Sequence, residues 1–241
     1  ESTKLQHVRM TLELESVRRC AVQLQERAVE AAKLLPGGAR ATAEARALRA
    51  LAETHAQETP AWCEHESLTS GRRLELAIEI VARALRRAGG AGGAGGAAGG
   101  AAGAVLRFDL LLLQAELLSK VCACGRRATP RAGCACRTAG SALRSLEAAE
   151  AQLSMYIVLT DESKAKAKAD VGRAKGHEAR RRCEEARAEA DEEARQRRPM
   201  AQRLRERRVE VLVELTLALA LTLTLTLTLT LTLTLALTLT L

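Results

Sequence analysis

The chain has 241 residues, of which 47% are hydrophobic and 27% charged, and it carries a net charge of +8. One Trp, one Tyr and one Phe are its only aromatic residues, so the apolar side chains are nearly all Ala, Leu and Val. The large rings that close enzyme cores, and those on which nucleic-acid modules stack bases, are therefore scarce. We expect a non-catalytic all-α protein whose helices pack through small side chains.

Residues 4–35 are predicted to form a coiled-coil helix. Their apolar residues recur at alternating steps of four and three, which keeps one seam of the helix facing a partner helix. The members of this seam are Met10, Leu14, Val17, Ala21, Leu24, Ala28, Ala31 and Leu35. Pro36 and the two glycines after it should end the helix, because proline lacks the donor that would continue it.

Two more helices are predicted over 40–57 and 67–88, with a turn at Thr59-Pro60 between them. The second repeats the seam spacing. Its seam consists of Leu74, Ile78, Val81, Leu85 and Ala88. We expect the helices at 4–35 and 67–88 to pack against each other, which makes 1–88 an N-terminal helical hairpin domain.

Residues 89–103 consist of nine glycines and six alanines. No side chain there is large enough to pack, so the segment is predicted to be a flexible linker that joins two helical units without fixing their orientation.

The next domain, 104–160, is expected to hold a Leu-rich helix at 104–121, buried between others, and a second helix at 141–159. A Cys-rich basic loop at 122–137 should connect them. It contains two Cys-x-Cys pairs, formed by Cys122, Cys124, Cys134 and Cys136. Four thiolates suffice for a tetrahedral zinc ion, the one cofactor we consider, but a single residue between paired ligands is unfavourable spacing. Disulfides and reduced thiols are the alternatives.

Two basic segments are candidates for binding a partner. Residues 119–145 hold six basic residues and no acid, and 171–208 hold thirteen basic against eight acidic residues. The candidate partner-binding residues are Arg126, Arg127, Arg131, Arg137, Arg180, Arg181 and Arg182. A positive field selects the sign of a partner and not its identity, so phosphate, an anionic membrane and an acidic protein are all compatible with it.

Residues 161–214 are predicted to form a long charged helix. Its seam over 161–198 holds only small residues, such as Ala165, Gly172 and Ala186, and small seams let two helix axes approach closely. We expect this helix to lie against the alanines of 4–35 or against a partner protein. Pro199 should kink or stop it.

The last segment, 215–241, is a low-complexity tail in which Leu alternates with Thr or Ala. Period-two alternation is typical of a strand, but a strand of this length needs a fibre or a large sheet. As a helix, the tail is long enough for a transmembrane anchor, and arginines precede it. A soluble or fibrous tail is the other alternative.

The function expected from these features is that of a structural or scaffold subunit of a larger assembly, packing along the helices of other subunits and anchored to a membrane if the tail spans one. The runner-up is a basic RNA- or DNA-associated module without strong sequence specificity. A thiol redox enzyme is a weaker alternative, because no βαβ pattern surrounds the cysteines, and no small-molecule substrate is expected. An odd number of cysteines argues against a secreted disulfide framework. The location stays open, with intracellular, organellar and membrane-associated ones as the alternatives.

Overall fold

The structure is a computed structural model that describes residues 2–57, 67–90, 101–128, 132–173 and 177–240. Within these ranges it is almost entirely helical and contains no strand, so the all-α prediction is confirmed. Its helices are α1 (Ser2–Lys33), α2 (Gly37–Ala56), α3 (Ser67–Gly90), α4 (Ala101–Ala128), α5 (Ala132–Arg173), α6 (His177–Arg195) and α7 (Arg197–Thr240).

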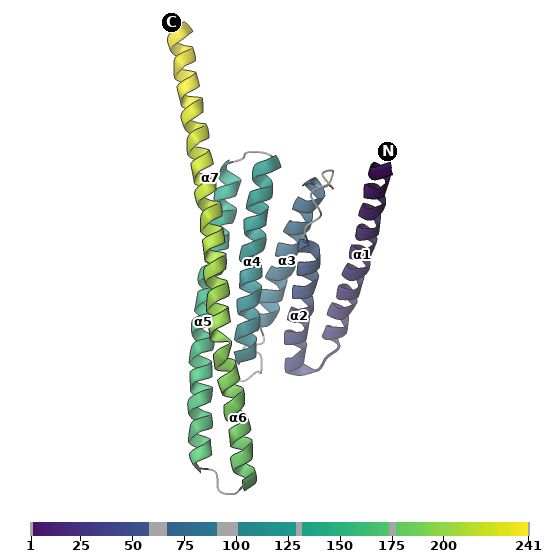
Figure 1. The fold of residues 1–241 in the computed structure, drawn as a ribbon, viewed down its shortest axis with the longest axis vertical. Helices are drawn as coiled ribbons and strands as arrows, with labels where there is room; N and C mark the ends of the chain where they lie inside the picture. Colours follow the sequence, from purple (N-terminus) through teal and green to yellow (C-terminus); the bar gives the residue numbers. More distant parts are fainter. Residues whose placement is uncertain (1, 58–66, 91–100, 129–131, 174–176, 241) are drawn as a thin grey trace.

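The helices form a row in which each packs on the next. Figure 1 shows α1, α2, α3 and α4 side by side, with α5 and α7 beyond α4. Helix α6 packs on the distal half of α5, and α7 then runs back along α5 and past the end of the bundle. Helix α1 therefore lies at one edge of the molecule, with α2 as its main neighbour.

Helix α4 is the centre of the fold because it contributes to two hydrophobic cores. Leu110 and Leu117 belong to the core shared with α1, α2 and α3. Phe108 and Leu112 belong to the core shared with α5 and α7. A helix that is apolar all around is expected to be buried in this way, and the prediction for 104–121 is confirmed.

The helices on either side of the predicted Gly/Ala linker are in contact. Helices α3 and α4 pack directly on each other, and α4 belongs to both cores. The connection between them, 91–100, lies outside the described residues. The flexible linker therefore stays a prediction.

The expected pairing of the helices at 4–35 and 67–88 is wrong. Helix α1 packs on α2 through Val29 and Ala32, which are not seam residues. The seam of α3 does face a core, with Leu74, Val81 and Ala88 buried, but its neighbours are α2 and α4. The seam of α1 remains on the outside.

The single helix expected over 161–198 is divided between two antiparallel helices. Helix α5 ends at Arg173 and α6 begins at His177, beside the two glycines of this segment, which favour helix less than alanine does. The partner of α6 is α5 and not the alanines of α1. Ala167 and Ala190 are buried in this hairpin, and Lys164 pairs with Asp191 at 2.5 Å. The Lys164 ammonium holds the pKa of the Asp191 carboxyl below its ordinary value.

Pro199 marks the next helix break, as predicted. Its missing N–H and its ring are incompatible with a helical bond to Arg195, the last residue of α6. Helix α7 restarts at Arg197, so Pro199 lies in its first turn, where proline is tolerated. The Met200 amide then donates to the Gln196 carbonyl at 3.2 Å.

The Leu/Thr tail is helical through Thr240 and not extended. Threonine hydroxyls donate to carbonyls one turn earlier, as from Thr224 to Ala220 at 3.0 Å and from Thr228 to Thr224 at 2.9 Å. Among the described residues, none of the helices combines the length and the apolarity that crossing a bilayer requires.

Candidate interaction surfaces

The outer face of α1 exposes the coiled-coil seam that the sequence predicts. Met10 is 51% exposed, Val17 67% and Leu24 63%. The inward face is carried by Val29 and Ala32. Successive helical residues are rotated by about 100°, so the centre of the seam lies roughly a quarter turn from the face of Val29 and Ala32, and Ala32 borders the seam. A contiguous apolar stripe in water is unfavourable, and such stripes mark surfaces that bind other proteins.

Three residues spaced by seven follow the free edge of this seam: Glu13, Cys20 and Arg27. All three are exposed, and Cys20 is a free thiol. The ion pair of Glu13 with Arg9, at 3.1 Å, is solvated on both sides and contributes little stability. In a coiled coil, residues at this edge determine which helix pairs and in which direction.

A basic cleft of about 590 Å³ separates α1 from α3 on the other side of α1. Glu15 lines this cleft, and its carboxylate lies 3.2 Å from the Arg18 guanidinium and 3.4 Å from that of Arg73. Arg19 and Arg72 also line the cleft. Four guanidinium groups against one carboxylate leave the cleft positive, so it suits an anion. The pair between Glu15 and Arg73 joins α1 to α3.

His55 lines the same cleft at the end of α2. Its pKa is lowered, chiefly because burial disfavours the charged imidazolium; the Glu26 carboxylate opposes this shift and Arg18 adds to it. The folded state therefore binds a proton less readily than the unfolded state, and stability is fully present only above the unfolded pKa.

We expect the melting temperature to fall as the pH is lowered from about 7.5 to about 5.5, through the ordinary histidine range. The His55→Gln variant should show a smaller fall, measured by circular dichroism, because it has no imidazole to protonate. An equal fall in both proteins would contradict a role for His55.

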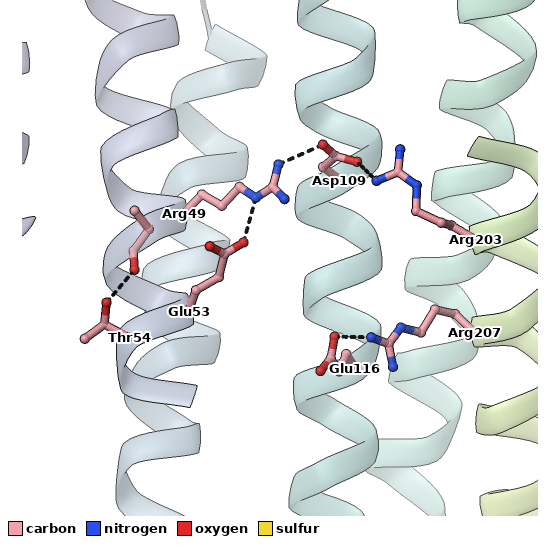
Figure 2. A network of polar contacts seen from close by, with 8 residues as sticks. Arg49, Glu53, Thr54, Asp109, Glu116, Arg203 and Arg207 are labelled. Carbon is pink, nitrogen blue, oxygen red and sulfur yellow. Dashed lines mark hydrogen bonds and ion pairs between the residues drawn. The ribbon is translucent and has the colours of Figure 1, made fainter. Parts of the chain in front are cut away.

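An ion-pair network ties the two cores together across α4 (Figure 2). The Asp109 carboxylate accepts from Arg49 of α2 at 2.7 Å and from Arg203 of α7 at 2.9 Å. About two turns further along α4, the Arg207 guanidinium donates a hydrogen bond to the Glu116 carboxylate at 2.6 Å. Burial lowers the pKa of Arg49, but Glu53 and Asp109 outweigh it and raise that pKa above its ordinary value.

These residues line a groove of about 260 Å³ between α2, α4 and α7. Each acid on α4 is engaged by arginine, so ion pairs join α2, α4 and α7 along this groove. The sequence did not single out the residues of this ion-pair network as a site. The available signal was the position of Asp109 and Glu116, seven residues apart and thus on one face of an otherwise apolar helix.

The four candidate metal ligands lie at the ends of two consecutive helices, because the loop expected at 122–137 is shorter than predicted. Cys122 and Cys124 belong to the last turns of α4, and Cys134 and Cys136 to the first turn of α5. Their side chains lie outside the described set, so the zinc, disulfide and free-thiol alternatives stay predictions. Among the side chains that are described, no three potential ligands converge on a common point.

The candidate arginines are distributed over α4, α5 and α6. Arg126 and Arg127 belong to α4, Arg137 to α5 and Arg180 to α6; the side chains of these four, and the whole of Arg131, lie outside the described set. Arg181 and Arg182 are exposed on α6 and pair with glutamates of the same helix, Glu185 at 3.4 Å and Glu178 at 2.7 Å.

Comparisons with protein-family models, with curated proteins and with solved structures find no match to this chain. The function is therefore inferred from the chemistry of these surfaces.

Proposed function

We propose that this chain is a non-catalytic structural subunit that binds a partner helix along the seam of α1. The observation that carries the proposal is the exposure of a regular seam: Met10, Leu14, Val17 and Leu24 are each 46% or more accessible to water. Burying a leucine-sized side chain is worth about 1.5–3 kcal/mol. The chain forgoes this gain unless another helix covers the seam.

The distribution of residue sizes on α1 supports the same proposal. The face that packs on α2 uses Val29 and Ala32, whereas the larger leucines and the methionine point outward. A helix whose task was only to close its own core would place its largest apolar side chains inward. Helix α1 also lies at the edge of the row, so its seam is accessible to a second protein (Figure 1).

The alternative, binding of RNA or DNA through basic segments, has weaker support. Arg181 and Arg182 are neutralised by glutamates on their own helix. The cleft between α1 and α3 is positive, but two of its arginines, Arg18 and Arg73, already pair with Glu15. The exposed apolar seam has no role in phosphate binding.

The proposal is tested by replacing Leu14, Val17 and Leu24 with serine together. In the cells that produce the protein, the tagged wild-type chain should elute in a complex larger than its own mass, and the triple variant should elute as the free chain. The melting temperature of the purified variant should change by no more than about 2 °C, because the substituted side chains are exposed.

The matched control replaces Leu5, Leu12 and Leu76 with serine. These leucines are 71%, 62% and 43% exposed and lie outside the seam. The control variant should elute with the wild type. Identical elution of wild type and seam variant would contradict the proposal, and so would unfolding of the seam variant, since the seam would then be part of the chain's own core.

A further inference from the structure

We infer that the helix covering this seam is α1 of a second copy of the same chain, running antiparallel. The inference rests on the proposed function and names its partner. It comes from the symmetry of the seam and its charged edge, which are complementary to themselves when one copy is rotated by a two-fold axis.

The charged edge sets the direction of pairing. Glu13 and Arg27 lie seven residues before and after Cys20. When two such edges meet antiparallel, Glu13 of each copy faces Arg27 of the other, and the two Cys20 thiols face each other at the axis. Opposite charges at these flanking positions stabilise a pairing, and like charges oppose it.

The sizes of the seam residues fit the same register. In it, Leu14 lies opposite Leu24 of the second copy, Val17 opposite Ala21, and Met10 opposite Ala28. Each large side chain except the leucine pair thus meets an alanine, and no layer consists of two alanines. A parallel pairing would instead place Ala21 on Ala21 and Ala28 on Ala28, which leaves gaps beside the larger layers.

The parallel arrangement also lacks a charge partner. Its flanking pair would join Glu13 to Arg18 of the second copy. Arg18 is already engaged in its own chain, donating to Glu15 at 3.2 Å and to the Gln57 carbonyl at 3.2 Å, and its side chain is only 14% exposed. Arg27 is exposed at the outer edge, so it is the cation that Glu13 of another copy can reach.

Access is open on the side that this dimer needs. The basic cleft and α3 lie along the Glu15 and Arg19 side of α1, whereas Glu13, Cys20 and Arg27 follow the opposite edge of the seam. The six seam layers from Met10 to Ala28 extend over about 27 Å of helix, at 1.5 Å per residue. Helix α1 ends the row of helices, so no further helix of the same chain lies beyond it (Figure 1).

The test is a charge exchange followed by light scattering coupled to size-exclusion chromatography. The purified wild-type chain should be a dimer. Glu13→Arg and Arg27→Glu, each made alone, should weaken dimerisation roughly tenfold, because each change replaces two attractions by two repulsions. Mixing these two variants should produce a heterodimer, since each edge then meets its opposite. The doubly exchanged chain should dimerise like wild type.

Two controls separate this register from other associations. Glu26→Arg makes the same chemical change on α1 away from the seam and should leave the dimer intact. A short bis-maleimide added to the wild type should link two copies of the peptide that contains Cys20, a product that only two chains can form, and Cys20→Ser should abolish this product.

Each result decides between the two proposals. A wild-type chain that stays monomeric at about 100 µM, or a dimer that ignores both charge changes, overturns the second-copy inference. If the second-copy inference is overturned but the triple serine variant elutes from cells as the free chain, the proposed function stands and the partner is a different protein. If seam substitution changes neither the cellular complex nor the purified dimer, the proposed function falls as well.

Discussion

Replacing Phe108 with alanine should lower the free energy of unfolding by about 3–5 kcal/mol, the largest effect of any single substitution considered for this chain. Phe108 is fully buried where α4, α5 and α7 meet, together with Tyr156 and Met200. The Arg203 guanidinium lies over its ring, 5.7 Å from the centroid, and adds a cation–π contribution. The loss is expected to be large because few other big side chains are available to fill the cavity.

Denaturant unfolding followed by circular dichroism measures this effect. Phe108→Leu keeps most of the volume and should cost less than half as much. Leu76→Ala removes a leucine that is 43% exposed on α3, and it should change the free energy of unfolding by no more than about 0.5 kcal/mol. A Phe108→Ala variant no less stable than Leu76→Ala would show that the α4–α5–α7 core does not hold the fold together.

Replacing Asp109 with alanine should cost about 2–3 kcal/mol, because it breaks two ion pairs in one step. Its carboxylate is 13% exposed and is shared by Arg49 at 2.7 Å and Arg203 at 2.9 Å. We place the effect below that of a fully buried pair, since the two arginines are themselves 34% and 46% exposed. Removal of Asp109 leaves two half-buried cations facing one groove.

The matched control is Glu53→Ala, which removes the other partner of Arg49. Glu53 is 48% exposed and pairs within its own helix, so this loss should stay below about 0.5 kcal/mol. A double-mutant cycle of Asp109→Ala with Arg203→Ala should show a coupling energy, since α4 and α7 are joined through this contact. Additive effects in the cycle would contradict a tie between the helices.

Much of the helical content was predictable from local pattern. The seam spacing of 67–88 and the apolar composition of 104–121 each predicted a helix that the structure contains, with the expected residues buried. Local signals also located the breaks near Pro36 and Pro199, because proline excludes a backbone hydrogen bond wherever it stands. These features depend on neighbours in sequence and need no knowledge of the fold.

The partners of each helix were not predictable in the same way. Seam spacing indicates that one face of a helix is apolar, but it does not indicate which other helix will pack on that face. The predicted pairing of 4–35 with 67–88 was wrong for this reason. Similarly, the ion-pair network at Asp109 depends on α2 and α7 arriving on the same side of α4, from 60 and 94 residues away in sequence. Charge spacing within one helix carries no information about either neighbour.

The sequence by itself determined that this protein is a set of helices, where most of them start and stop, and that α1 carries a regular apolar seam, because these properties follow from propensity, proline chemistry and periodicity along the chain. Only the tertiary structure decided that α4 is shared by two cores and that the α1 seam faces water while Val29 and Ala32 face inward. The physical reason is that which apolar face becomes buried depends on the packing of all the helices together, and a single helix does not determine it.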